Sequence, residues 1–169
     1  MKIVNTFKFA AAVFGVLTLG LSTSANAATA NTTFSVTATV QATCSISATG
    51  LSFGTYTGAV NNVSSTITVT CTNTTPYRVG LDAGLATGAT VTTRKMNGSG
   101  LAAGQTLSYS LSQDSGHTTN WGNTPGTDTP ASVNGNGSAQ TSTVYGQIPA
   151  NQFVTPGSYS DTITATVNY

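Results

Sequence analysis

The sequence predicts an all-β domain of the immunoglobulin-like sandwich class. Only 5% of the 169 residues are charged and glutamate is absent, so the side chains that favour helices are scarce. Apolar residues alternate with threonine and serine along several short runs, which is the period of a strand with one buried face. Glycine and proline interrupt these runs where turns are expected. About seven short strands with frequent turns are typical of this sandwich.

The predicted strands are runs in which every second residue is apolar. In chain order the apolar series are Phe34, Val36, Ala38, Val40, Ala42 and Cys44; Ile67, Val69 and Cys71; Tyr77, Val79 and Leu81 after Pro76; Leu107, Tyr109 and Leu111; and Ile163, Ala165, Val167 and Tyr169. The predicted turns contain Gly54, Gly84, Gly88, Gly98, Gly100, Gly104 and the Pro156-Gly157 pair.

Residues 1–27 predict a signal peptide rather than a part of the fold. Two lysines accompany the start, residues 9–21 are almost entirely apolar, and residues 25–27 (Ala-Asn-Ala) fit the small-x-small site of signal peptidase. A transmembrane anchor is the alternative, but the apolar run is shorter than the roughly 20 residues that span a bilayer. We therefore expect export, with a mature chain that starts at Ala28.

Export also sets the expectation for the two cysteines, Cys44 and Cys71, which are the only ones in the chain. In an oxidising compartment such a pair is typical of one disulfide, and two free thiols are the less favoured alternative. A metal site fits the sequence less well, because the chain has a single histidine and no Cys-x-x-Cys motif. We expect no cofactor and no metal.

The mature chain carries three cations and four aspartates, for a net charge of −1. Scattered cations cannot follow a phosphate backbone, which argues against nucleic-acid binding. Leu, Ile, Val and Phe supply only 24 of its 142 residues. So small a share is typical of disorder when net charge is high, but here the charge is near zero and the alternation is regular. We interpret the chain as a β-domain with barely enough apolar surface of its own.

Residues 112–143 are rich in Gly, Asn, Thr and Ser and contain one large apolar side chain, Trp121. Trp121 is either a plug that folds back onto the core or a platform for a sugar. We favour the plug, because a lone tryptophan without a cluster of carboxylates or amides is weak evidence for a sugar site.

Both ends of the mature chain are predicted strands. The N-terminal run, residues 30–42, is longer than the usual strand of about 5–6 residues. A bare strand with one apolar face can pair into the sheet of another molecule. The alternative is that it forms the first strand of its own sandwich. Part of it does so if Cys44 is to reach Cys71, which leaves the segment before about Val40 free.

Three segments together are informative: residues 141–148 (TSTVYGQI), the turn at residues 120–122 (Asn-Trp-Gly) and the ending at residues 156–169. They resemble the spore coat protein U domain family, which includes the main subunits of archaic chaperone–usher pili such as the Csu type. The most specific part is the motif G-x-Y-x-D-T, matched by Gly157, Tyr159, Asp161 and Thr162. The resemblance covers residues 34–169, and the paired cysteines match as well.

The resemblance implies a sandwich at residues 41–169 that lacks its final strand. A periplasmic chaperone lends a strand first, and residues 28–40 of the next subunit replace it at the outer-membrane usher. Phe34, Val36, Ala38 and Val40 are then the donor side chains, although Ala38 is small for this role. Ile163, Ala165, Val167 and Tyr169 edge the acceptor groove and contact the chaperone. The implied function is that of a structural pilus subunit, supporting adhesion and biofilm formation, with identical or related pilin subunits as partners. The implied location is the cell surface, reached by export through the periplasm.

Other functions fit less well. His117 is the only histidine that could act as a base, and its pairing with Asp114 in a polar loop lacks the Gly-x-Ser-x-Gly turn of serine hydrolases, so we expect no enzyme. A tip adhesin would need a further receptor domain, for which 142 residues leave no room. The remaining alternative is a self-sufficient secreted module that binds carbohydrate or forms part of a surface coat.

Overall fold

The computed structural model describes residues 27–169. The chain divides into two units, residues 1–38 and residues 39–169. In residues 27–43 there is no helix or strand, and every side chain is exposed. The predicted signal peptide lies almost wholly outside the described residues and stays a prediction. Within those residues, no helix has the length and apolar character that a bilayer crossing requires.

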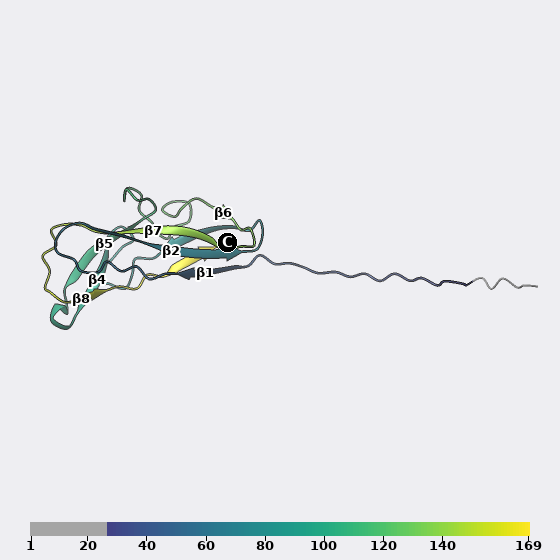
Figure 1. The fold of residues 1–169 in the computed structure, drawn as a ribbon, viewed down its shortest axis with the longest axis horizontal. Helices are drawn as coiled ribbons and strands as arrows, with labels where there is room; N and C mark the ends of the chain where they lie inside the picture. The colour runs from purple at the N-terminus through teal and green to yellow at the C-terminus, as the bar shows by residue number, and fades with distance from the viewer. Residues whose placement is uncertain (1–26) are drawn as a thin grey trace, which may run out of the picture. The chain divides into compact units, whose positions relative to one another are not determined.

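Residues 39–169 form two antiparallel sheets, which confirms the predicted all-β class (Figure 1). The larger sheet has six strands in the order β1-β2-β7-β5-β4-β8, which are Cys44–Ala48, Asn61–Cys71, Gln140–Ile148, Thr106–Ser112, Arg94–Ser99 and Ser158–Ser160. The smaller sheet has the order β6-β3-β9, which are Val133–Asn134, Pro76–Leu81 and Ala165–Asn168. A single 3-10 turn, η1 (Gly100–Ala102), follows β4.

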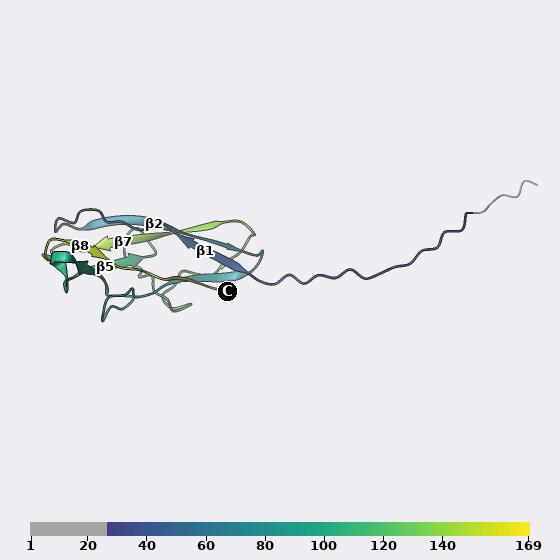
Figure 2. The ribbon, with the colours of Figure 1, turned by 90° about the horizontal axis from the view of Figure 1, so that it is seen from below.

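The core lies between the two sheets and is built from the predicted alternation. Ile67, Val69 and Cys71 of β2 point inward, as do Leu107, Tyr109 and Leu111 of β5, and Tyr77, Val79 and Leu81 of β3. Their neighbours in sequence are mostly polar and face outward, as expected for strands with one buried face. The longest pairing of the described strands joins β2 and β7, which run side by side over nine residue pairs (Figure 2).

The predicted disulfide is present and joins two neighbouring strands. Cys44 opens β1 and lies directly opposite Cys71, the last residue of β2. The bond closes a loop of 27 residues in sequence separation, which corresponds to roughly 2–4 kcal/mol of stabilisation.

Trp121 folds back onto the core, which confirms the plug interpretation. Its side chain is 1% exposed, and its Nε1 donates a 2.9 Å hydrogen bond to the Val79 carbonyl. The stretch between β5 and β7 that contains Trp121 is also held to the end of β3, since Leu81 N donates a 2.8 Å hydrogen bond to Gly122 O. A face held in the core is not free to bind a sugar.

Two details of the strand prediction change. The long N-terminal run enters the sheet only at Cys44, so all of residues 34–43 lie outside the strands. Gly98 was predicted in a turn but lies within β4. A side chain there would collide with the backbone of Ala102, because a Cβ would overlap the Ala102 carbonyl oxygen. The glycine is therefore required by close packing of η1 against β4.

Candidate functional site

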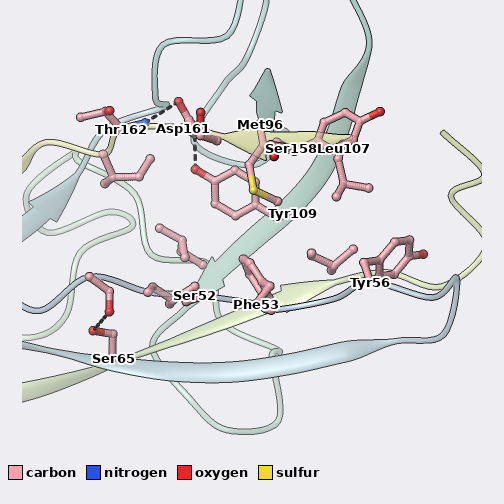
Figure 3. A pocket seen from close by; sticks show the side chains of 18 of the residues that line it. Ser52, Phe53, Tyr56, Ser65, Met96, Leu107, Tyr109, Ser158, Asp161 and Thr162 are labelled. Carbon is pink, nitrogen blue, oxygen red and sulfur yellow. Dashed lines mark hydrogen bonds between the residues drawn. The ribbon is translucent and has the colours of Figure 1, made fainter. Parts of the chain in front are cut away.

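An elongated apolar groove opens along one side of the sandwich, with a volume of about 1110 Å³ (Figure 3). Its floor is made of core side chains from five strands: Ile67, Leu81, Met96, Leu107, Tyr109, Leu111, Val144 and Ile148. Residues 48–58, from the end of β1 onward, form one wall. Residues 152–165, which include β8 and end at the start of β9, form the other. The groove therefore borders the hydrophobic core directly, and its floor side chains other than Met96 are at most 7% exposed.

The walls of the groove carry backbone groups without backbone partners. In the described part of the chain, residues 50–57 and 152–157 make no backbone–backbone hydrogen bond. β1 ends the order of the larger sheet, β9 ends that of the smaller one, and the two strands lie next to each other without pairing. The groove itself lies between the two wall segments, and two unpaired stretches of backbone over an apolar floor have the features that a sheet needs to accept one more strand.

Side chains hold the first wall in place instead of a ladder. The Ser65 hydroxyl donates to the Thr49 carbonyl at 2.6 Å, and Asn61 Nδ2 donates to the Phe53 carbonyl at 2.7 Å. The Tyr56 hydroxyl donates to the Pro149 carbonyl at 2.6 Å. The same hydroxyl accepts a 3.1 Å hydrogen bond from Gln152 N of the second wall, so the two walls are joined at this point.

The second wall is anchored at its start and in its middle. The Gln152 amide accepts from Ser108 N at 2.8 Å and donates to Ser108 O at 2.9 Å, which imitates a strand residue beside β5. Asp161 Oδ1 accepts from Leu85 N and Thr162 N, both at 2.8 Å. The carboxylate therefore ties the wall to the loop after β3.

Asp161 also reaches into the groove. Its Oδ2 accepts a 2.7 Å hydrogen bond from the hydroxyl of Tyr109 on the floor. Burial, together with this hydrogen bond and the negative charge of Asp161, raises the pKa of Tyr109 well above its ordinary value. The hydroxyl is therefore a protonated donor at all physiological pH values.

The predicted acceptor residues divide between the groove and its surroundings. Ile163 and Ala165 line the groove. Val167 lies beyond it in β9, opposite Val79, and packs against the core. Tyr169 is 60% exposed at the end of the chain. Of the predicted segment 163–169, only the first half borders the cavity, and its role as an acceptor of a strand stays a prediction.

The first wall was missed by the sequence analysis. Leu51, Phe53 and Tyr56 are half-buried and line the groove, but their spacing of two and then three residues breaks the period of a strand. The signal that remains is a cluster of large apolar residues between Cys44 and β2.

The predicted donor side chains are all on the surface. Phe34 is 85% exposed, Val36 83% and Val40 86%, and Ala38 is exposed as well. Three large apolar side chains therefore alternate along this segment without cover from any residue that the structure describes.

The Asp114 and His117 side chains do not form a catalytic pair. Asp114 Oδ1 accepts from the backbone and hydroxyl of Thr118, and its Oδ2 accepts from Thr119 N at 2.7 Å. These backbone hydrogen bonds lower the pKa of Asp114 to about 2. The carboxylate closes a turn, and the ring of His117 lies edge-on to Tyr145 instead. Among residues 27–169 no cluster of His, Cys, Asp or Glu could hold a metal ion.

The comparisons with known proteins agree with this geometry. The model of the Spore Coat Protein U domain matches residues 30–166. Protein U of Myxococcus xanthus is 36% identical over 182 residues, covering 98% of this chain and 99% of that protein.

One solved structure is also similar: the CsuC–CsuE chaperone–tip adhesion subunit pre-assembly complex from the archaic chaperone–usher Csu pili of Acinetobacter baumannii. The match has a TM-score of 0.57 at 25% identity. It covers 78% of this chain and spans 41% of the matched chain in that complex. The chain, which matches the family model over nearly all of its described residues, belongs to the Spore Coat Protein U domain family.

Proposed function

We propose that the protein is a structural subunit of a surface pilus that assembles by exchange of donor strands. The open apolar groove, with an unpaired backbone edge on each side, carries this proposal. Residues 28–40 of a neighbouring copy fill the groove and complete its core. Their apolar face is exposed in the isolated chain, and the groove lacks the apolar cover that this face supplies.

The donor strand is held in two ways. Its backbone pairs with the free edges of the walls, and the side chains of Phe34, Val36, Ala38 and Val40 enter the groove. A thin core is then sufficient, because each subunit borrows apolar surface from the next one. The likeness to a complex of a chaperone with a pilus subunit supports a periplasmic chaperone as an earlier occupant of the groove. Ile163, Ala165, Val167 and Tyr169 border the segment that this chaperone contacts, and an outer-membrane usher then directs the exchange.

In this proposal the fibre serves adhesion and biofilm formation at the cell surface. The self-sufficient coat module remains the second candidate, and the family's name favours it. The two candidates differ in whether the groove must be filled from another molecule.

The proposal is tested by placing a charge on one face of the donor segment. Val36→Asp puts a carboxylate into the apolar groove, which costs several kcal/mol, so fibres should be absent from electron micrographs of producing cells. Thr37→Asp is the matched control, because its side chain points to the other face of the same strand. It should form fibres in near wild-type amounts. Fibres of normal yield from Val36→Asp would show that this face is not inserted.

A further inference from the structure

A chain of three side chains crosses the groove from one wall to the other. The ring of Phe53, on the first wall, meets the ring of Tyr109, on the floor, edge-on with centroids 6.1 Å apart. The Tyr109 hydroxyl donates to Asp161 on the second wall. All three residues line the groove, and Figure 3 shows Tyr109 between the other two. We refer to Phe53, Tyr109 and Asp161 as the cross-bridge.

The cross-bridge is a fixed feature of the groove. The second carboxylate oxygen of Asp161 is held by Leu85 N and Thr162 N, and the ring of Tyr109 is buried. Its polar atoms are therefore already paired within the domain. Side chains from the floor and both walls meet here, so an incoming side chain finds this point of the groove already occupied.

Apolar residues that line the groove lie on both sides of the cross-bridge. On β5, Leu107 and Leu111 are each two residues from Tyr109, so they lie about 7 Å away along the floor. On the second wall, Tyr159 and Ile163 are each two residues from Asp161. On the first wall, Phe53 is flanked by Leu51 and Tyr56. We call the apolar lining residues on either side of the cross-bridge the two compartments of this one groove.

The donor segment has the complementary order. Ala38, the smallest residue of its apolar series, has Val36 and Val40 two residues away on either side. We propose that Ala38 of a second copy lies over the cross-bridge, with Val36 and Val40 in the two compartments, and that this match sets the register of the donor strand. The inference rests on the proposed function and adds the residue pair that determines its specificity.

Other registers are disfavoured for physical reasons. A shift by two residues places a valine on the cross-bridge and leaves alanine in a compartment, which loses apolar contact and adds a clash. A shift by one residue turns Thr37 and Thr39 into the groove and the valines out to solvent. The small side chain at position 38 makes fewer apolar contacts than a larger one would, but it is the feature that fixes the register of the donor strand.

The test enlarges the donor residue in the full chain, in cells that export and assemble it. Ala38→Leu should lower the fibre yield about tenfold or more, since a larger side chain has no room over a fixed ridge. Val36→Leu, which adds a single methylene at a compartment, is the matched control and should stay within about twofold of wild type. Neither residue belongs to the sandwich, so circular dichroism of the exported monomers should be unchanged.

A compensating variant separates a fit to the cross-bridge from a general preference for alanine. Phe53→Ala removes the end of the cross-bridge on the first wall and opens space beside Tyr109. Combined with Ala38→Leu in one chain, it should restore fibres to at least half of the yield of Phe53→Ala alone. This coupling is expected only if positions 38 and 53 of neighbouring copies meet.

Three outcomes are decisive against the inference. If Ala38→Leu assembles as well as wild type, or if both leucine variants fail equally, Ala38 does not set the register. If the double variant folds but stays as defective as Ala38→Leu alone, the residue over position 38 is not the cross-bridge. All three leave the proposed function intact as long as Val36→Asp still blocks assembly. Fibres from Val36→Asp, or none from the wild-type chain, would instead overturn both.

Discussion

The guanidinium of Arg94 donates a 2.7 Å hydrogen bond to the backbone carbonyl of Trp121, and both side chains are completely buried. The same guanidinium donates to the carbonyls of Leu81, Asp82 and Val91 at 2.7–2.9 Å. One cation therefore joins β4, the end of β3 and the loop that carries Trp121. Burial lowers the pKa of Arg94, while nearby groups such as Tyr109 and Asp82 oppose this effect.

Replacing Arg94 should be among the most damaging single changes in the domain. Arg94→Met keeps much of the volume but leaves several buried carbonyls without a donor, so we expect a loss of about 3–5 kcal/mol in the free energy of unfolding. Urea denaturation measures it. Arg78→Met is the control, because Arg78 is half-buried and makes one hydrogen bond, to Pro130; it should cost about 1 kcal/mol. Equal effects at the two sites would contradict the structural role of Arg94.

Trp121 should behave as a core residue. Trp121→Ala is expected to cost about 3–5 kcal/mol, the usual cost of emptying a large buried site. Trp121→Phe keeps an aromatic ring and loses chiefly the bond to Val79, so it should cost less. Thermal unfolding gives both values. If Trp121→Ala has normal stability but abolishes binding on a glycan array, the residue is a ligand platform after all.

Asp114, in the turn before Trp121, should make the stability of the domain depend on pH at acidic values. Its pKa is lowered to about 2 from an ordinary 3.8, so its contribution to stability is fully present above pH 3.8 and is lost as the pH falls through about 2. Wild type should therefore exceed Asp114→Asn in stability at pH 5, and the difference should shrink between pH 4 and pH 2. Chemical-denaturant unfolding at several pH values measures this. A constant difference across that range would show that the carboxylate is not linked to folding.

A chain that supplies its own donor strand should be stable without help. We expect a second copy of residues 30–40, attached after Tyr169 through a flexible linker, to fill the groove and raise the melting temperature. The linker gives the strand an effective concentration of roughly millimolar, which a dilute monomer lacks. Calorimetry and size-exclusion chromatography measure stability and oligomeric state. The control carries Val36→Asp in the added copy. If the chain without residues 28–38 is already a stable monomer and the fusion adds nothing, the groove is not an acceptor site.

The sequence identifies the strands whose inward side chains are apolar, because burial of alternate residues leaves a visible period. Ile67, Val69 and Cys71 are an example. β4 was not predicted, because its sequence, Arg-Lys-Met-Asn-Gly-Ser, contains one apolar residue and its buried end is Arg94. That side chain is stabilised by carbonyls from distant segments, which no local pattern reveals.

The groove, too, could be predicted from the sequence only in part. Ile163 and Ala165 could be found from the alternation near the end of the chain. The opposite wall, including Leu51 and Phe53, has no regular period, because its backbone is held by the side chains of Ser65 and Asn61 rather than by a ladder. The cross-bridge needs residues from three separated segments and emerges only from the fold.

The position of Cys44 has a mechanical consequence. A pull on the chain ahead of β1 reaches the domain at residue 44, the first residue of that edge strand. Through the disulfide, the load passes covalently into Cys71 at the end of β2, which is paired to β7 along nearly its whole length. Tension is thereby shared with an inner strand instead of peeling the edge strand away one hydrogen bond at a time. Under reducing conditions the five residue pairs of β1 and β2 would bear that load alone, and the domain should yield at a lower force.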